Sequence, residues 1–250
     1  MGLALTRLIR ERPRFALVGA ATAADDPACG RDLGELAGQG ALGVTLSADL
    51  GSALLGADVA IDFSAPGAVP RLAAAAASGG VALVSGTTGL PEAARAALER
   101  ASARIPVLWA PNTSLGVQVL AELVTAAVRQ LGEAFDVEIV EVHHGRKTDA
   151  PSGTALRLAE AARLARPALA ERHGRSGAVG ARGHDELGVL AVRGGDVIGD
   201  HTVHLLGAGE RLELTHRATS RDVFALGALR AAEFVVGRPP ALYTLRDLLA

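Results

Sequence analysis

The sequence predicts an α/β protein in two parts: a doubly wound parallel sheet, and a second α+β domain with an open, mixed or antiparallel sheet. Two observations lead to this expectation. Before about residue 113, short apolar segments that suit buried strands alternate with segments of helical periodicity. After a long helical segment, the chain instead carries strand-like runs separated by glycine turns. With 250 residues, of which 49% are hydrophobic, the chain can bury a substantial core as one large domain or two small ones.

The first part is expected to open with a helix and then to alternate strands with helices. Proline near the start supports the helices that begin at Ala65 and Pro91. A polar, glycine-rich stretch over 25–43 is expected to be a loop that contains a turn of helix. Helices are predicted at Leu3–Arg12, Leu50–Leu55, Ala65–Ser78 and Pro91–Ala103, and strands at Phe15–Ala20, Val59–Phe63, Val81–Ser85 and Ile105–Ala110. The short turns between them predict a parallel, Rossmann-like sheet.

Three loops of this first part are candidates for ligand binding, because ligands of doubly wound sheets bind outside the carboxyl ends of the strands. They are the loop after Ala20, the GTTG turn Gly86–Gly89 and the APNT segment Ala110–Thr113. Taken by itself, GTTG is better interpreted as an ordinary turn than as a binding loop.

The second part is expected to begin with a long helix, Ser114–Leu131, which Gly132 ends. A strand at Phe135–Val142 follows, and 165–185 is interpreted as a surface loop whose histidines are solvated. Later segments of strand character are expected to form an antiparallel meander that joins the first strand in one open sheet. They are Leu187–Val192, Val197–Leu206 and Arg211–Ala218, and they precede a helix at Val223–Val236 and a short closing helix at Leu242–Leu249.

The segment His143–Ala155, HHGRKTDAPSGTA, contains two histidines, a lysine, an aspartate and a Ser-Gly-Thr turn. The strand before it should deliver the histidines at its carboxyl end, and Ser152 or Thr154 should cap the helix after it. A helix start beside Gly153, hydroxyl donors and the charge of Lys147 together suit an anion. Because histidine exchanges protons near neutral pH, the segment suits a small carboxylate substrate that undergoes proton-coupled chemistry.

Each part of this cluster also has a simpler interpretation. A histidine after a strand is more often structural than catalytic, and Pro-Ser-Gly is commonly a turn before a helix. The cluster as a whole nevertheless favours a functional site. A metal site is less favoured, because adjacent histidines on a strand point to opposite faces and no cysteine or carboxylate lies at ligand spacing.

Composition narrows the classes of function. The net charge of −2 and the pI near 6.4 provide no basic field, which argues against a nucleic-acid binder. The single cysteine, Cys29, excludes an internal disulfide and fits a reducing compartment, so we expect a cytoplasmic protein. No run of about 18 apolar residues suggests a membrane span. The basic and then apolar stretch Arg7–Ala21 resembles a signal peptide, but it also fits a strand of the sheet, which we prefer.

The run EVHHGRKTDAPSGTA, Glu141–Ala155, resembles the signature of the 4-hydroxy-tetrahydrodipicolinate reductase family, and the similarity extends along nearly the whole chain. The resemblance implies NAD(P)H-dependent reduction of 4-hydroxy-tetrahydrodipicolinate to tetrahydrodipicolinate, with loss of water, in lysine and diaminopimelate biosynthesis. It also implies a homotetramer in which the GTTG and APNT loops line the dinucleotide. The implied cofactor-binding residues are Gly86, Thr87, Thr88, Ala110, Pro111, Asn112 and Thr113.

The same resemblance assigns roles to the two parts. Residues 1–113, with a C-terminal return over 222–250, would bind the dinucleotide, and residues 114–221 would bind the substrate and form the oligomer. Closure of the two domains would bring the nicotinamide to the substrate. His143 is implied to be the general acid, and Lys147 is implied to polarise the substrate. The substrate carboxylate would be held by His144, Ser152, Gly153 and Thr154, with Asp149 and Pro151 shaping the loop.

The sequence departs from the family pattern at its beginning. The family carries a strand and G-x-x-G-x-M-G there, and only Met1 and Gly2 match this pattern. Because the other motifs are intact, we expect a start codon assigned at an internal methionine rather than a truncated protein. A second hypothesis is a non-catalytic dicarboxylate-binding or assembly protein that lacks the pyrophosphate loop. A different dehydrogenase with the same two-domain plan is a third hypothesis, which the specific HHGRK and PSGTA runs make less favoured.

A second departure concerns the ribose of the cofactor. An acidic residue after the second strand binds the 2′-hydroxyl of NAD, whereas an arginine accepts the 2′-phosphate of NADP. This chain has Thr22–Asp26, TAADD, at that place, and Asp25 would repel a phosphate. We therefore expect NADH rather than NADPH.

Overall fold

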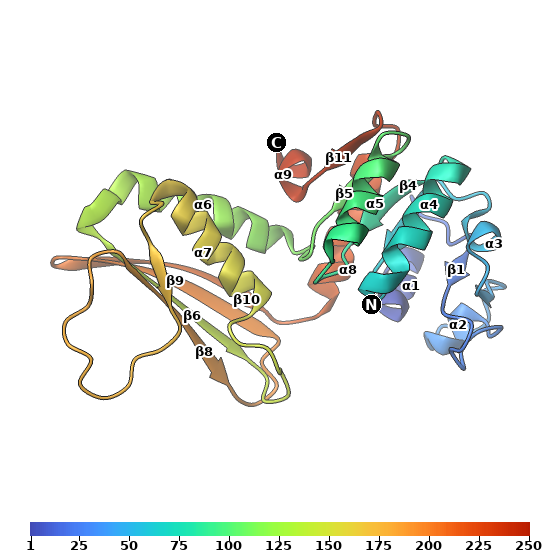
Figure 1. Cartoon of the computed structure of the whole chain (residues 1–250). Helices are drawn as coiled ribbons and strands as arrows, with labels where there is room; N and C mark the ends of the chain where they lie inside the picture. Colours follow the sequence, from blue (N-terminus) through green and yellow to red (C-terminus); the bar gives the residue numbers. More distant parts are fainter. The chain divides into compact units, whose positions relative to one another are not determined.

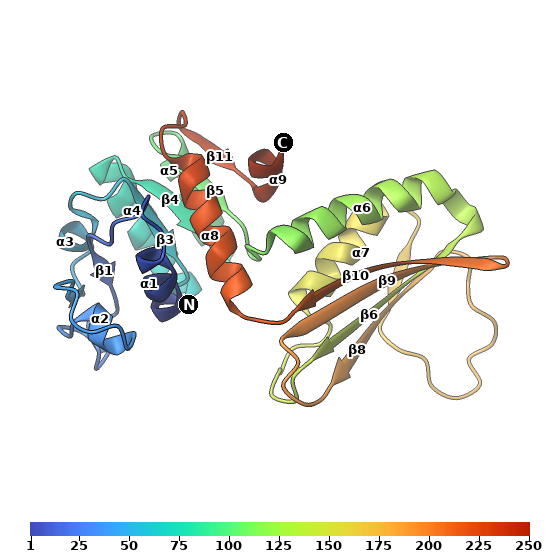
Figure 2. The same ribbon diagram turned by 180° about the vertical axis from the view of Figure 1, so that it is seen from behind.

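The computed structural model describes residues 1–250, which form two compact units (Figures 1 and 2). The first unit contains Met1–Ser114 and Asp222–Ala250, and the second contains Leu115–Arg221. The first unit has a parallel sheet between helices and the second has a mixed sheet, which confirms the predicted α/β fold class. None of the helices combines the length and the hydropathy that a membrane crossing requires.

The first unit alternates helices with strands and ends with elements from the C-terminal part of the chain. Its helices are α1 (Gly2–Arg10), α2 (Leu33–Leu36), α3 (Leu50–Leu54), η1 (Pro66–Ala68), α4 (Val69–Gly79), α5 (Glu92–Ser102), α8 (Asp222–Val235) and α9 (Leu245–Leu249). Its strands are β1 (Ala20–Ala21), β2 (Leu46–Ser47), β3 (Val59–Asp62), β4 (Ala82–Ser85), β5 (Pro106–Trp109) and β11 (Ala241–Tyr243). Most of the predicted elements are therefore present within one or two residues of their expected bounds.

Four parallel strands form the main sheet of this unit, in the order β11-β5-β4-β3. Helices α4 and α5 cover one face, and α8 with α1 beside it covers the other (Figures 1 and 2). The core includes the fully buried side chains of Leu83, Leu98 and Ile105. Because β4 and β5 are neighbours, with Ser85 opposite Trp109, the loops that follow them leave the sheet side by side.

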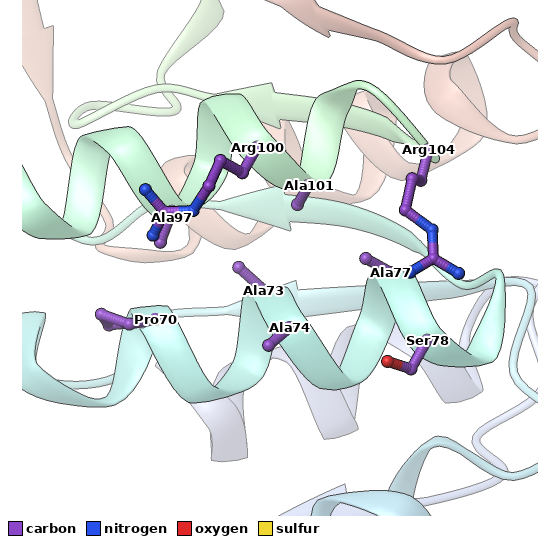
Figure 3. A pocket seen from close by; sticks show the side chains of 9 residues that line it. All are labelled: Pro70, Ala73, Ala74, Ala77, Ser78, Ala97, Arg100, Ala101 and Arg104. Carbon is purple, nitrogen blue, oxygen red and sulfur yellow. The ribbon is translucent and has the colours of Figure 1, made fainter.

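Small side chains line a groove between α4 and α5. The groove has a volume of about 260 Å³, and its floor is made of alanine methyl groups (Figure 3). It is lined by Pro70, Ala73, Ala74, Ala77, Ser78, Ala97, Arg100, Ala101 and Arg104. Its two charged side chains are Arg100 on α5 and Arg104 in the turn directly after α5. The groove therefore results from the packing of alanine-rich helices, not from polar groups that converge on it.

The predicted strand at Phe15–Ala20 is wrong. The structure has only the two-residue strand β1 there, which pairs in parallel with β2, and residues 15–19 form no helix or strand. Val18 is 51% exposed, so the apolar character of this segment is not matched by burial. A strand requires a neighbouring backbone to satisfy its hydrogen bonds, and β3 pairs only with β4 rather than with this segment.

The second unit packs two helices against one face of a five-stranded sheet (Figures 1 and 2). Its helices are α6 (Leu115–Leu131), η2 (Gly132–Ala134) and α7 (Gly153–Ala165). Its strands are β6 (Asp136–His143), β7 (Ala170–Arg172), β8 (Glu186–Arg193), β9 (Gly199–Gly207) and β10 (Glu210–Ala218). The sheet order is β10-β9-β6-β8-β7, and β6 runs parallel to β8 and antiparallel to β9. Val124, Ile139 and Leu158 are fully buried between helices and sheet.

Three details differ from the prediction. The predicted antiparallel meander is wrong for β8 and β9, because β6 lies between them and only β9 and β10 form a hairpin. The connection from β8 to β9 passes the end of β6, where the carbonyl of Val197 accepts a hydrogen bond from the His144 N–H at 2.7 Å. The predicted loop 165–185 contains the edge strand β7. The predicted closing helix is instead β11, which pairs with β5, followed by α9.

Candidate functional site

The motif segment of the second unit is organised around one buried carboxylate, that of Glu141 on β6. Glu141 and His143 face the helices, as Ile139 does, because alternate residues of a strand share a face. Glu141 is fully buried, and its oxygens accept hydrogen bonds from Arg193 at 2.7 and 2.8 Å. Burial alone would raise the pKa of Glu141, but the hydrogen bonds from Arg193 and His143 outweigh burial and hold this pKa below its ordinary value. Glu141 is therefore an anion at neutral pH.

His143 lies at the end of β6 beside this carboxylate. Its Nδ1 is 2.5 Å from Oε2 of Glu141, and the residue is 8% exposed. A Cβ at Gly199 would lie 2.9 Å from Nε2 of His143, so the glycine leaves room for the imidazole. One ring nitrogen is thus held by the carboxylate, and the other faces the start of β9.

Ser152 caps α7, which resolves the alternative left open between Ser152 and Thr154. Its Oγ accepts a hydrogen bond from the Ala155 N–H at 3.1 Å, and its own N–H donates to Glu141 at 3.0 Å. The Oγ also lies 3.0 Å from Nε2 of His201. Ser152 is buried, whereas Gly153 is exposed and Thr154 is half-buried. The accessible part of this helix start is therefore formed by Gly153 and Thr154.

Lys147 lies in the loop between β6 and α7. Its Nζ donates to both carboxylate oxygens of Asp149 at 2.8 Å, and this hydrogen bond lowers the pKa of Asp149. The Lys147 side chain is 20% exposed. The carbonyl of Asp149 in turn accepts from Arg193 at 2.7 Å. The loop that carries the lysine is therefore tied to the same arginine that holds Glu141.

His144 and His201 are two further histidines of this region, and the pKa of each is lowered. Burial lowers the pKa of His144, and the nearby charges of Arg146 and Arg221 add to this effect. His201 on β9 packs against His143 edge to face, with ring centroids 5.1 Å apart and an angle of 77° between the planes. Burial, together with His143, lowers the pKa of His201 to about 4. Both rings are therefore favoured in their neutral form at neutral pH.

The GTTG turn of the first unit is anchored from inside by the buried carboxylate of Asp62. This carboxylate accepts hydrogen bonds from Ser85 Oγ at 2.7 Å and from Thr87 Oγ1 at 2.9 Å. Trp109 Nε1 donates to the carbonyl of Thr87 at 3.2 Å. Gly86 has no room for a side chain, because a Cβ there would lie 2.3 Å from the ring of Phe63. Thr88 and Gly89 form the exposed edge of the turn.

The neighbouring APNT loop is held in place by a hydrogen bond to α8. Ala110 and Thr113 are buried, and Thr113 Oγ1 donates to the carbonyl of Phe224 on α8 at 2.6 Å. Pro111 is exposed and Asn112 is half-buried, with its Oδ1 accepting from the Ser114 N–H at 2.9 Å. Thr87 and Thr113 therefore support the two loops, whereas Thr88, Pro111 and Asn112 contribute their outer surface.

Sequence reasoning assigned no role to four residues of this site, namely Glu141, Arg193, Gly199 and His201. A signal existed for Glu141, because a glutamate two residues before His143 on a strand shares its face. The others come from β8 and β9, and their approach depends on strand order. No group of three or more His, Cys, Asp or Glu side chains is arranged to hold a metal ion.

Comparison with known proteins identifies relatives of the whole chain. The family models for the N-terminus and the C-terminus of dihydrodipicolinate reductase match residues 1–113 and 116–249. The 4-hydroxy-tetrahydrodipicolinate reductase of Anaeromyxobacter dehalogenans (strain 2CP-1 / ATCC BAA-258) is 50% identical over 252 residues, which cover 100% of this chain and 93% of the relative. The protein of the same name from Halorhodospira halophila (strain DSM 244 / SL1) is 46% identical over 255 residues and covers 100% and 94%.

A solved structure also shares the fold. The dipicolinate-bound dihydrodipicolinate reductase from Paenisporosarcina sp. TG-14 has a TM-score of 0.76, with 96% of this chain and 92% of that chain covered. Its sequence identity of 23% makes it a match of fold alone. The two family models and the full-length relatives are decisive: the chain belongs to the dihydrodipicolinate reductase family.

Proposed function

We propose that this protein reduces 4-hydroxy-tetrahydrodipicolinate to tetrahydrodipicolinate, with loss of water, as a step in lysine and diaminopimelate biosynthesis. The observation that carries the proposal is the convergence of His143, the Lys147 loop and the start of α7 on the Glu141–Arg193 pair. This places a proton-exchanging ring, a cation and helix-start donors within one small region, which suits a dicarboxylate. The names of relatives that are 50% and 46% identical support the same reaction.

Within this proposal, His143 is the general acid that protonates the substrate carbon next to the one that accepts the hydride. Lys147 polarises the substrate, and it exchanges its contact with Asp149 for one with the substrate. The substrate carboxylate is held by the neutral ring of His144 and by the helix start at Ser152, Gly153 and Thr154. Because the Ser152 hydroxyl already caps α7, Gly153 and Thr154 are the more accessible members of this group.

The N-terminal family match and the doubly wound sheet support a nicotinamide cofactor. When bound, this cofactor supplies the hydride. The two loops fit its nicotinamide half, because Gly86 lets the first turn pack closely against Phe63 and the edges of both loops are accessible. We propose that it is lined by Gly86, Thr87, Thr88, Ala110, Pro111, Asn112 and Thr113. The pyrophosphate pattern of the family matches only Met1 and Gly2, so no further residue is assigned to that group.

We further propose that NADH is preferred over NADPH. Asp26 is engaged within its own loop, where it accepts hydrogen bonds from Thr22 Oγ1 at 2.5 Å and from the Ala28 N–H at 2.8 Å. Asp25 is exposed in the loop that follows β1, so its carboxylate is available to a ribose hydroxyl and would repel a phosphate.

We also propose a homotetramer that forms through the face of the second sheet that α6 and α7 leave uncovered. By strand register, apolar side chains share this face: Val140, Val142, Leu190, Val192 and Leu206. Val192 and Leu206 lie toward opposite ends of this face and are 48% and 36% exposed, and Val140, Val142 and Leu190 are half-buried. A second copy of the chain packed on this face would cover these apolar side chains. Light scattering should give the mass of four chains, and a monomeric mass at micromolar concentration would contradict the proposal.

The experiment that tests the function is turnover with substrate generated in situ, followed by oxidation of NADH and of NADPH in separate reactions. We expect turnover with both nucleotides and a larger kcat/KM with NADH. Dipicolinate binding without turnover, with either nucleotide, would instead favour the non-catalytic dicarboxylate-binding alternative. A larger kcat/KM with NADPH would contradict the role given to Asp25 and leave the reaction itself supported.

A further inference from the structure

We propose that the Glu141–Arg193 ion pair is a positioning element: it determines which ring nitrogen of His143 exchanges protons, and it holds the Lys147 loop and the start of α7 against that histidine. Its effect on turnover rests on the proposed reductase function. Its effect on the His143 ring does not, so the two can be tested separately.

The ion pair has a geometry that is specific and protected from solvent. Nη1 and Nη2 of Arg193 donate to different oxygens of Glu141 at 2.7 and 2.8 Å, the bidentate arrangement in which a guanidinium binds a carboxylate most specifically. Glu141 has 0% of its surface exposed. Arg193 lies opposite His143 in the parallel pairing of β6 with β8. The register of the sheet therefore brings the arginine to the histidine.

The donors around Glu141 determine the tautomer of His143. Oε1 accepts hydrogen bonds from Arg193 and from the Ser152 N–H, and Oε2 accepts from Arg193 and lies 2.5 Å from Nδ1 of His143. An ionised carboxylate has no hydrogen to donate, so Nδ1 must carry the hydrogen of this contact. In the neutral ring the lone pair is then on Nε2, and in the charged ring the exchangeable proton is on Nε2. Proton transfer to a substrate is thereby restricted to Nε2.

The groups that face the His143 ring leave Nε2 as the usable atom. The backbone of Gly199 lies beside Nε2, where any side chain would come within 2.9 Å. The His201 ring packs edge to face and is favoured in its neutral form, so it adds no charge next to His143. The charged groups of this cluster are Glu141 on the same strand and Arg193 on β8, and Lys147 in the following loop acts on the pKa of the neighbouring His201. Among these, only Glu141 bonds to the ring.

The same ion pair also ties the neighbouring segments in place. Oε1 of Glu141 binds the Ser152 N–H, which belongs to the N-cap of α7. Nη2 of Arg193 donates to the carbonyl of Asp149, whose carboxylate holds Lys147. The histidine, the cation and the helix start are thus fastened to one carboxylate and its guanidinium partner. Loss of the Glu141 charge should therefore change the tautomer of His143. It should also change how the Lys147 loop and the start of α7 are positioned relative to that ring.

Strand β6 also offers a matched control in Glu138, which faces the opposite side of the sheet. Glu138 is 9% exposed and accepts hydrogen bonds from Arg175 and Arg182 at distances of 2.7–3.0 Å. It is thus a buried glutamate of the same strand whose carboxylate is hydrogen-bonded by arginines and not by a histidine. If buried ion pairs of β6 had a purely structural role, replacing either glutamate should lower kcat to a similar extent. A positioning role predicts that kcat and the His143 tautomer change only when Glu141 is replaced.

The test compares Glu141→Gln and Glu138→Gln with the wild-type protein by ¹⁵N NMR of the histidine rings and by steady-state kinetics. The His143 signals are assigned from their absence in His143→Gln. In the wild type, at a pH where His143 is neutral, we expect a protonated Nδ1 and an unprotonated Nε2. Glu141→Gln should shift the ring toward a mixture of both neutral tautomers, because an amide can either donate or accept. Its kcat should fall roughly 10- to 100-fold, a part of the ~10²–10⁴-fold contribution of a general acid.

Glu138→Gln should keep the wild-type His143 spectrum and kcat. An Nε2–H tautomer in the wild type would overturn the proposal without any variant, and so would an unchanged His143 spectrum in Glu141→Gln. Equal loss of kcat in both variants would assign the ion pair a structural role only. If no form of the protein turns over substrate, the proposed function fails, yet the wild-type ring spectrum still decides the tautomer.

Discussion

Replacing His143 by alanine is expected to lower kcat by about 10²–10⁴-fold, the contribution of a positioned general acid. This substitution leaves in place the substrate contacts proposed for the Lys147 loop and for α7, so KM should change much less than kcat. The measurement is the initial rate of nucleotide oxidation at saturating substrate. Full wild-type turnover by this variant would remove His143 from the mechanism.

Two companion variants separate chemistry from folding. His143→Gln keeps an amide that can donate to Glu141 but cannot exchange a proton at neutral pH, so it should be as slow as the alanine variant. His204 is a half-buried histidine of β9 that lies 3.4 Å from Glu213, and its alanine variant should keep wild-type activity. A large loss of kcat in the His204 variant would point to a general sensitivity of the sheet to histidine removal.

Replacing Lys147 by alanine is expected to act mainly on substrate binding. A hydrogen bond to a charged group contributes about 1.5–3 kcal/mol, which corresponds to a ~10- to 100-fold increase in KM. The lysine is available for this contact because its ammonium is partly exposed and is bound only to the side chain of Asp149. The measurement is KM for the substrate together with Kd for dipicolinate, which needs no turnover.

Arg146 provides the control for this effect, because it is an exposed cation directly before Lys147 in the chain. Arg146→Ala makes the same change in net charge, so it should raise KM far less if the contact with Lys147 is specific. Equal increases for both variants would indicate attraction by the overall charge of the loop. An unchanged KM for Lys147→Ala would contradict the role proposed for the lysine.

Local sequence signals predicted the elements that carry the motif. The Val- and Ile-rich segment before His143 predicted strand β6, and the Ser-Gly-Thr turn predicted a capped helix, which begins at Gly153 with Ser152 as its N-cap. These features depend on residues that are close in sequence, where backbone preference and capping chemistry decide the outcome. The alternation of strands and helices in the first unit could be predicted for the same reason.

Local sequence signals could not predict which strands pair or which residues far apart in the sequence make contact. Arg193 reaches Glu141 across 52 residues, and His201 reaches Ser152 across 49. Both contacts exist only because β6 lies between β8 and β9, whereas the glycine turns of the sequence suggested that those two strands are neighbours. The segment Phe15–Ala20 shows the opposite error: its composition suits a strand, but a strand also needs a paired neighbour, which composition does not reveal.

The hydrogen bond between Trp109 and the carbonyl of Thr87 has a practical consequence. Trp109 is the single tryptophan of the chain, and its indole also lies 5.8 Å from the guanidinium carbon of Arg95. When the protein is excited at the red edge of indole absorption, its intrinsic fluorescence therefore comes from Trp109 alone. This ring is hydrogen-bonded to the GTTG turn. A ligand that displaces this turn changes the polarity around that ring, so the protein carries its own optical probe at one defined loop.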